Sequence, residues 1–468
     1  MAGPLVHEDS NRVVGPWMIQ RAFSYLSRGD LGPTLIRAFA GSVGLRIAGM
    51  ALGFLVGVQL ARGLGAAGYG VYGLAMSVVS LVMIPAEFGL PQLVTREIAA
   101  GHARQDLAHV RGVFVWANRV VLILSLAIFV VGLAGWLFFG DQLNEDLRYA
   151  LLAGAFLVPT VALANLRGAA LRGMQQIVRG QIPEVVLRPA IFSVLLFGVS
   201  VVLPSGLTPS FAMVMHAVAV ALTLVLAAYM LRAAFPTGRS GVPSRSTTKA
   251  WLHSSIPMAF TEAMRALQGN FSILILGVLA TTVTVGIFRV ASSMSLLINM
   301  PVALIHVVSG PIISRLHASH DMNRLQKLIG WTTLSMVVGS ACMTIPFFFF
   351  GQEILGLLFG SEYSPSNASL LILSVGTVVG SAFGPGATLL NMTGYEKRVT
   401  RSLGLSLVLL AILALPLTFY LGAAGAALAN SFSFVFWSAV LWKDAWHLLG
   451  VDASLRYTVM CHRRLSGV

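Results

Sequence analysis

Long apolar runs fill most of the chain, and short stretches containing Arg, Gly, Pro or Asp separate them. A helix of about twenty apolar residues crosses the roughly 30 Å hydrocarbon core of a bilayer. The pattern therefore predicts an all-α integral membrane protein. We expect twelve transmembrane helices, at residues 41–61, 71–91, 113–139, 149–166, 183–204, 209–231, 253–279, 284–312, 329–350, 366–390, 402–421 and 423–447.

The distribution of basic residues predicts how these helices are oriented. Arg and Lys are concentrated in the N-terminal tail, the even-numbered connections and the C-terminal tail. The odd-numbered connections are short and contain only Arg62 and Arg148 as basic residues. Cytoplasmic segments of membrane proteins carry an excess of Arg and Lys. We therefore expect both termini and all even-numbered connections to lie in the cytoplasm.

Landmarks that recur along the chain predict an internal repeat. Gly70 opens the second expected helix and Gly286 the eighth, 216 positions later, and Pro85 and Pro301 follow at the same offset. Six helices per half would make the halves parallel repeats, related by an axis along the membrane normal, with a substrate site between them. The expected units are a cytoplasmic tail (1–40), a first six-helix bundle (41–232), a linker (233–250), a second six-helix bundle (251–447) and a cytoplasmic tail (448–468).

The composition excludes a soluble globular protein. Hydrophobic residues make up 56% of the chain and charged residues 10%, and the mean hydropathy is +0.82. A soluble protein carries about 25% charged residues. The formal net charge of +14 comes from Arg and Lys in the segments expected in the cytoplasm. Membrane orientation accounts for these residues, so we expect no nucleic-acid partner. Two cysteines make no disulfide framework and there is no phosphate-binding loop, so we expect neither ATP hydrolysis nor a cofactor or metal.

Several motifs resemble those of membrane proteins of polysaccharide biosynthesis, and they occur in the same order. These relatives are the O-antigen and exopolysaccharide flippases of the multidrug/oligosaccharidyl-lipid/polysaccharide exporter superfamily. The motifs are Leu64-Gly-Ala-Ala-Gly-Tyr-Gly-Val-Tyr-Gly-Leu-Ala, Glu87-Phe-Gly-Leu, Thr95-Arg-Glu-Ile-Ala, Phe359-Gly-Ser-Glu-Tyr-Ser-Pro-Ser-Asn-Ala and Gly422-Ala-Ala-Gly-Ala-Ala-Leu-Ala.

The resemblance, which runs from about residue 34 to residue 447, implies a fold, a substrate and a location. The fold would be MATE-like, with two bundles around a central cavity. The substrate would be an oligosaccharide repeat unit on a polyprenyl pyrophosphate, moved across the bacterial inner membrane. Membrane lipid, a polysaccharide polymerase and glycosyltransferases of the same pathway would be the partners.

Arginines within the apolar runs are the strongest candidates for substrate binding. An ionisable group at membrane depth costs about 2.5–3.5 kcal/mol on insertion, so it is retained for a function. Arg46, Arg265 and Arg289 lie in the first, seventh and eighth expected helices. A guanidinium stays charged and holds phosphate oxygens with a planar fork. Alternatively, Arg46 and Arg289 extend to the membrane surface, and Arg265 pairs with Glu262.

Two carboxylates are candidates for coupling transport to an ion. Glu262 lies three residues from a candidate arginine, and Glu87 lies near the end of the second expected helix. The alternative for Glu87 is a helix-end carboxylate that faces Arg96. We expect Glu184 and Arg188, four residues apart, to form an ordinary helical ion pair.

These features favour a flippase for lipid-linked oligosaccharides over three alternatives. A cation-coupled multidrug exporter of the same fold would be expected to place carboxylates in its cavity. A membrane-embedded polysaccharide polymerase or ligase would need a large external loop, and the odd-numbered connections are short. A structural scaffold would need no charges at membrane depth. We therefore expect a transporter and no enzymatic activity.

Overall fold

The computed structural model describes residues 32–202, 207–235 and 245–456, and all regular structure in these ranges is helical. The prediction of an all-α protein is confirmed. The first part of the chain forms α2 (Gly32–Glu87), α3 (Leu90–Ala103), α4 (Leu107–Phe139), α5 (Glu145–Gly173), α6 (Ile177–Ile182), α7 (Arg188–Val202) and α8 (Pro209–Ala234), with short turns η1 (Gly140–Gln142) and η2 (Pro183–Leu187).

The second part of the chain begins with α9, before the expected start of the second bundle at residue 251. Its helices are α9 (Arg245–Leu279), α10 (Thr282–Ile298), α11 (Met300–Ala318), α12 (Met322–Phe359), α13 (Ser366–Ser381), α14 (Gly386–Met392) and α15 (Glu396–Leu449), with the turn η3 (Ser361–Tyr363). Half of the expected linker, residues 236–244, lies outside the described residues, as do residues 1–31 of the expected N-terminal tail.

Backbone breaks correct several expected helix boundaries. The helix expected at 71–91 ends at Glu87, because Phe88 and Gly89 have positive φ angles. The helix expected at 284–312 consists of α10 and α11, bent by 42°. The one expected at 366–390 consists of α13 and α14, bent by 47°. Pro301 opens α11 and Pro385 precedes α14, in keeping with the missing N–H of proline.

The two longest helices each contain a break. α15 has 54 residues, and its backbone leaves helical geometry at Gly422, where φ is 56°. α2 breaks in the same way at Gly65, where φ is 66°. An unbroken helix of α15's length would measure about 80 Å, far more than the roughly 30 Å of a hydrocarbon core. Seven described helices are long and apolar enough to cross a membrane, or up to nine if each bent pair is one span, so the count of twelve stays a prediction.

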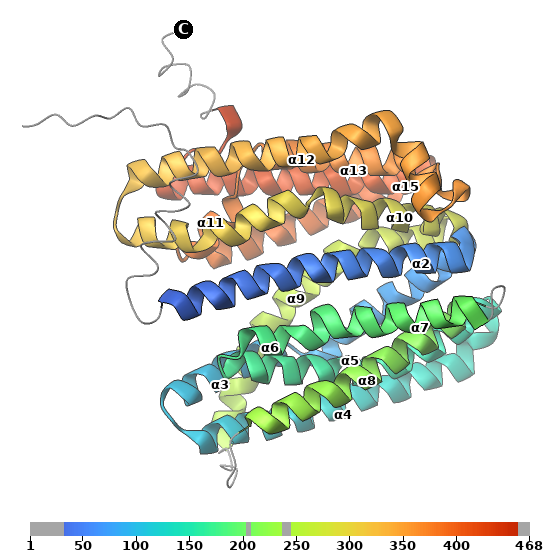
Figure 1. Ribbon diagram of the computed structural model, residues 1–468, viewed down its shortest axis with the longest axis horizontal. Coiled ribbons are helices and arrows are strands. Elements are labelled where there is room, and N and C mark those ends of the chain that lie inside the picture. The colour runs from blue at the N-terminus through green and yellow to red at the C-terminus, as the bar shows by residue number, and fades with distance from the viewer. Residues whose placement is uncertain (1–31, 203–206, 236–244, 457–468) are drawn as a thin grey trace, which may run out of the picture.

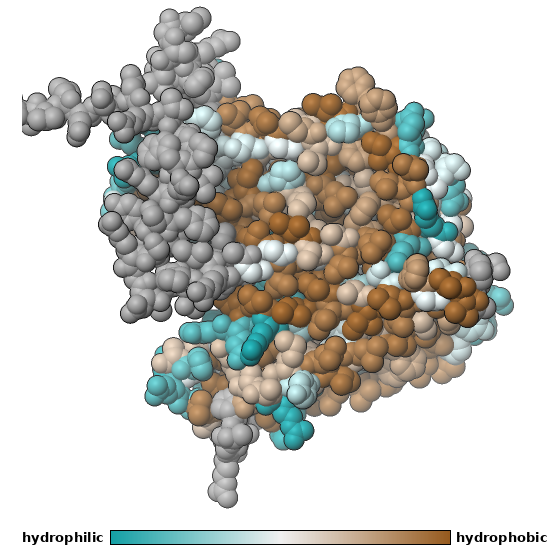
Figure 2. Space-filling model, viewed as in Figure 1, coloured by the Kyte–Doolittle hydropathy of each residue, from teal (hydrophilic) through white to brown (hydrophobic). Residues whose placement is uncertain are grey.

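The helices form two groups on either side of α2 (Figure 1). α3–α8 lie on one side, where α5 packs against α8 and α4. α10–α15 lie on the other, where α13 packs against α15 and α12 packs against α11. Large apolar side chains are exposed along the helices, and the view in Figure 2 shows an apolar surface across the middle with polar residues toward the ends.

α2 packs against α5 and α7 and is counted with the first group from here on; its contact with α10 is the closest between the two groups, and we call this contact the seam. A Cβ on Gly70 would lie 1.8 Å from the carbonyl oxygen of Thr282, and one on Gly286 would lie 2.1 Å from that of Ala66. Small residues allow such close backbone approach. The two glycines paired as repeat landmarks in the sequence therefore face one another across the seam.

Residues just after α15 are docked onto the second group of helices, although the sequence predicts a tail from residue 448. The Gln326 side chain exchanges two hydrogen bonds with the backbone of Asp452, of 2.6 and 2.8 Å. The Thr333 hydroxyl donates to the carbonyl of Ala453, which is fully buried. This segment packs at the bend between α13 and α14, where a Cβ on Gly384 would meet the Ala453 carbonyl oxygen.

Candidate functional site

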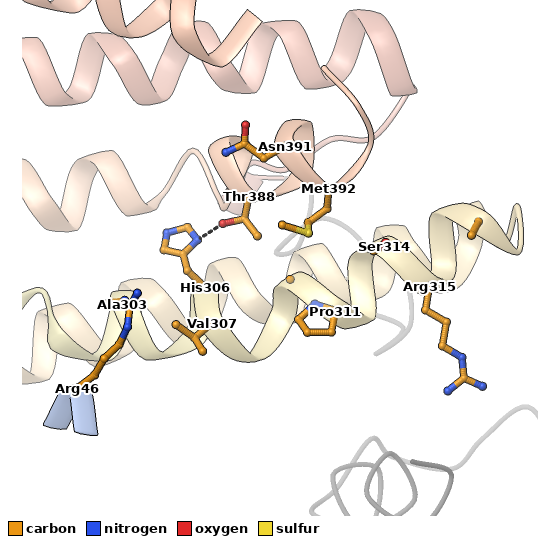
Figure 3. A pocket seen from close by; sticks show the side chains of 12 residues that line it. Arg46, Ala303, His306, Val307, Pro311, Ser314, Arg315, Thr388, Asn391 and Met392 are labelled. Atoms are coloured by element: carbon orange, nitrogen blue, oxygen red, sulfur yellow. Dashed lines mark hydrogen bonds between the residues drawn. The ribbon is translucent and has the colours of Figure 1, made fainter. Parts of the chain in front are cut away.

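A cavity of about 760 Å³ lies between α2, α11 and α14 (Figure 3). We call it the cavity. Its polar lining comes from three helices: Arg46 on α2, His306 and Arg315 on α11, and Thr388 and Asn391 on α14. The bend between α13 and α14 directs α14 toward α11, and a hydrogen bond of 2.8 Å joins His306 Nδ1 to Thr388 Oγ1.

The lining of the cavity is positively charged. Arg46 is exposed and extends from α2 toward α11, whereas Arg315 extends from α11 (Figure 3). No Asp or Glu is among the described residues that line the cavity. Two guanidinium groups on different helices, with hydroxyl, amide and imidazole groups between them, make a site suited to a phosphorylated anion.

Arg265 does not line this cavity. It is exposed on α9, and no ion pair joins it to Glu262 within the part of the chain that the structure describes. Glu262 instead accepts a hydrogen bond of 3.1 Å from the Gln92 side chain on α3. The structure therefore places Arg46 at the cavity and Arg265 outside its lining.

Arg289 crosses the seam from α10 to α2 and does not extend to the membrane surface. Its Nη1 donates to the carbonyl oxygen of Gly73 at 3.3 Å. Its guanidinium carbon lies 5.5 and 5.6 Å from the ring centroids of Tyr69 and Tyr72. Cations are attracted to aromatic faces at such distances. In this conformation Arg289 joins the two groups of helices and is not among the described residues that line the cavity.

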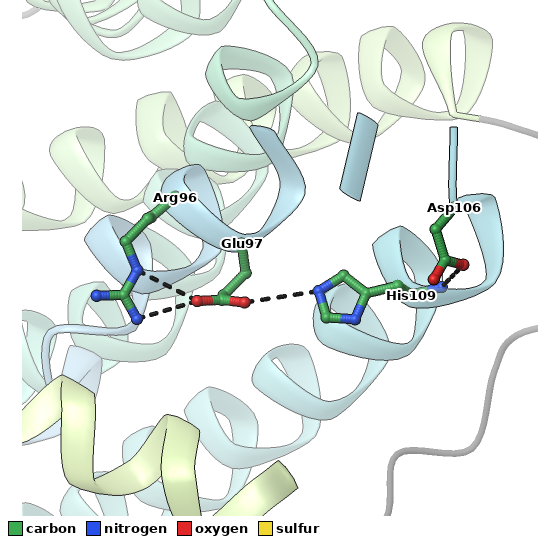
Figure 4. Close-up of polar contacts among 4 residues, drawn as sticks. All are labelled: Arg96, Glu97, Asp106 and His109. Atoms are coloured by element: carbon green, nitrogen blue, oxygen red, sulfur yellow. Dashed lines mark hydrogen bonds and ion pairs between the residues drawn. The ribbon is translucent and has the colours of Figure 1, made fainter. Parts of the chain in front are cut away.

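Glu87 is bound within the first group of helices. It accepts a hydrogen bond of 2.7 Å from Asn165 on α5. The expected alternative partner, Arg96, pairs with Glu97 at 3.0 Å, as Figure 4 shows. His109 Nε2 lies 3.6 Å from the other oxygen of the same carboxylate, so Glu97 contacts both basic side chains.

The expected Glu184–Arg188 ion pair is not formed. Glu184 lies 3.7 Å from Arg172 instead. Residues Pro183–Leu187 form a π-helical turn, whereas the expected spacing assumes an α-helix. Both Glu184 and Arg188 line a small second cavity together with Asn165.

Just before the break of α2 at Gly65, hydrogen bonds join α2 to the end of α12 and to η3. Arg62 Nε donates to the carbonyl of Leu358 at 2.8 Å, and its Nη2 donates to that of Leu357. The Tyr363 hydroxyl donates to the carbonyl of Ala61 at 3.0 Å. Burial raises the pKa of Tyr363 far above its usual value, so the phenol remains protonated and can donate. We call these contacts the end closure.

Sequence reasoning missed two histidines inside the helices. His306 lines the cavity, and His216 on α8 bonds to Tyr72 at 2.9 Å. The rule used for the arginines, that an ionisable residue within an apolar run is a functional candidate, applies equally to these two histidines. Arg62 was noted only as a charge in a connection, and nothing in its neighbouring sequence indicates its partners.

Comparison with known proteins establishes the family. Residues 38–317 match the polysaccharide biosynthesis protein family, and this is more than half of the chain. The chain belongs to that family, so the resemblance found in the sequence is confirmed. A curated relative, the probable low-salt glycan biosynthesis flippase Agl15 of Haloferax volcanii, is 26% identical over 428 residues, covering 86% of this chain and 81% of the relative.

Solved structures show the fold to be MATE-like. An inward-facing multidrug resistance MATE transporter superposes with a TM-score of 0.68 at 15% identity, covering 91% of this chain and 99% of that one. The lipid II flippase MurJ in an inward closed conformation gives a TM-score of 0.68 at 12% identity, covering 88% and 87% of the two chains. The protein is therefore a multi-pass membrane protein with a MATE-like fold.

Proposed function

We propose that the protein is a flippase that moves a polyprenyl-pyrophosphate-linked oligosaccharide across the cytoplasmic membrane by alternating access. The cavity, whose described lining contains arginines and no Asp or Glu, carries this proposal, because a pyrophosphate requires cationic partners once it leaves water. The polyprenyl tail remains in the lipid while the charged head and its sugars cross. The family match and the flippase names of its relatives agree with such a cargo.

The architecture that we propose for this movement has twelve spans in two parallel six-helix bundles, with both termini in the cytoplasm. The breaks at Gly65 and Gly422 support it, because each divides a helix too long for one span. In this arrangement the cavity opens to the cytoplasm, and the end closure seals the external side. Rocking of the bundles that opens the end closure and the seam would then expose the head group to the outside.

The predicted roles of the individual residues fit this conformation to different degrees. Arg46 is proposed to bind the pyrophosphate in the cavity. Arg265 and Glu262, on one face of α9, keep their proposed roles in binding and ion coupling. Glu87 stays a second coupling candidate. Arg289 would reach a substrate only after the seam has opened, since it is now bound to Gly73.

We propose the synthesis of a surface polymer, either lipopolysaccharide O-antigen or exopolysaccharide, as the pathway. The upstream partners would be glycosyltransferases that build the repeat unit, and the downstream partner a polymerase. A deletion strain should accumulate lipid-linked repeat units on the cytoplasmic leaflet. Wild-type protein should clear them and Arg46→Ala should not, whereas Arg119→Ala should, because Arg119 is exposed on α4 away from the cavity.

Similarity to multidrug transporters suggests a second cargo, which the same strain would reveal. A cationic drug would be repelled by Arg46 and Arg315, and no acidic residue of the described chain lines the cavity to bind it. If deletion changes drug sensitivity and leaves lipid-linked glycans unchanged, the exporter interpretation is right and the flippase proposal is wrong.

A further inference from the structure

His216 is an ionisable side chain inside an apolar helix. It lies seven residues after Pro209, the first residue of α8, which places it about 10 Å along the helix. Its ring stacks on Phe192 with centroids 4.6 Å apart and an interplanar angle of 12°. Its Nδ1 lies 2.9 Å from the hydroxyl of Tyr72. An imidazole is the side chain that changes charge most readily near neutral pH.

The charged groups that act on His216 are both cations, and the one carboxylate of η2, which also packs against α8, is that of Glu184, which lies 3.7 Å from Arg172. Arg188 approaches from α7 and Arg289 from α10, while α2 contributes the hydroxyl of Tyr72. α5 packs along α8 but carries its charged residues at its two ends. These are Glu145, Asp146 and Arg148 at the start and Arg167 and Arg172 at the end. A proton on His216 would therefore add a third positive charge beside these two arginines.

Tyr72 connects His216 to the seam. Its hydroxyl bonds to the imidazole, and the face of its ring is covered by the Arg289 guanidinium. Arg289 has no carboxylate partner among the ion pairs of the described residues, and its buried Nε has no hydrogen-bond partner there. It is held by two aromatic faces and one carbonyl group. The position of Arg289 therefore depends on α2 and α10 remaining in contact.

We propose that His216 is a proton-binding site whose occupancy is coupled to opening of the seam between α2 and α10. In the closed seam, with Arg289 over Tyr72, the proposed site holds no proton, because the added charge would lie near two guanidinium groups. In the tautomer whose Nδ1–H donates to the Tyr72 hydroxyl oxygen, Nε2 carries the lone pair, so it binds a proton when the seam opens and Arg289 moves away with α10. When the seam closes, Arg289 returns and the proton leaves to water.

The coupling is reciprocal, so a proton on His216 also favours the open seam. This inference rests on the alternating access of the proposed function. The proton would bind in the outward-open state and leave in the state described here, so it would move inward as the substrate moves outward. No bond other than N–H is made or broken.

The distance between the two groups of helices at the end closure tests the inference without any substrate. Spin labels at Leu143→Cys and Tyr420→Cys, both exposed near that end, would be attached in a Cys342→Ser, Cys461→Ser background. Double electron–electron resonance would be recorded in lipid nanodiscs at pH 5 and pH 8. In the wild type we expect the population with the long distance, relative to that with the short one, to be about tenfold larger at pH 5 than at pH 8. A tenfold change lies within the usual range of coupling between two sites.

Variants assign this response to one histidine. His216→Gln should remove the pH dependence, whereas His306→Gln should retain it, since His306 is the matched intramembrane histidine bonded to Thr388. Arg289→Gln should populate the long distance at both pH values. Size-exclusion chromatography would check that each variant is folded. If His216→Gln misfolds, Tyr72→Phe takes its place: it keeps the ring, removes the hydroxyl that bonds to His216, and should weaken the pH response.

Three results would overturn the inference: a wild type without a pH response, a response that survives in His216→Gln, or one that disappears in His306→Gln instead. The proposed function is tested separately by the lipid-linked glycans of the deletion strain. A pH response that depends on His216 in a protein that moves no glycan would leave the proton site standing and refute the flippase proposal.

Discussion

Replacing Arg62 by alanine should release the end closure. The guanidinium donates to the carbonyls of Leu357 and Leu358, at the last turn of α12, where unpaired carbonyl groups carry partial negative charge. Hydrogen bonds to charged groups contribute about 1.5–3 kcal/mol when buried. Arg62 is exposed, so solvent screens these bonds, and we expect Arg62→Ala to destabilise the closed state relative to the open state by about 1–2 kcal/mol.

That cost corresponds to a shift of about 5- to 30-fold toward the open end, since 1.4 kcal/mol is a factor of ten. The spin-label distance across the end closure would measure it at fixed pH. Arg148→Ala is the matched control, because Arg148 lies near the same end but pairs with Asp141 in its own group of helices. An unchanged distance distribution in Arg62→Ala, or an equal shift in Arg148→Ala, would refute the reasoning.

Two further substitutions test the seam and the docked C-terminal segment. Gly286→Val should prevent the seam from closing and so abolish transport, because even a Cβ at this position would lie 2.1 Å from the carbonyl oxygen of Ala66. Gly269→Val is the control and should leave transport unchanged, because a Cβ there would have no neighbouring atom within 4 Å. Equal transport by the two variants would contradict the close contact at the seam. Gln326→Ala should loosen the segment around Asp452 by about 1–3 kcal/mol, through loss of two hydrogen bonds. Hydrogen exchange at residues 451–455 would measure this, and unaltered protection would show that the bonds are dispensable.

The sequence predicts the helices of this protein better than their relative arrangement. Apolar length and the landmarks Gly70 and Gly286 indicate a membrane protein with related halves, and the structure places those two glycines face to face. Pro301 lies inside an expected helix, but the bend of 42° beside it depends on packing that no local pattern reveals. Break points at Gly65 and Gly422 fall where the pattern places short connections.

The candidate site was only partly predictable, because the helices are apolar on every side. An amphipathic pattern tells which face of a soluble helix is buried. Here lipid-facing and core-facing positions are both apolar, so the sequence does not show where a polar side chain points. Arg46 does line the cavity, but Arg289 turns into the seam and Arg265 is exposed on α9.

Transport by the purified protein tests the central proposal most directly. The protein would be reconstituted in vesicles with a fluorescent polyprenyl-pyrophosphate oligosaccharide, and movement between leaflets would be followed by quenching from outside. Loss of one charge-assisted phosphate contact weakens binding by about 10- to 150-fold, so Arg46→Ala should raise the substrate concentration needed for half-maximal transport by that factor. Arg46→Lys should lie between this variant and the wild type, because lysine keeps the charge and lacks the fork. Movement of the lipid-linked oligosaccharide that is the same with or without the protein, or the same in Arg46→Ala and wild type, would contradict the account.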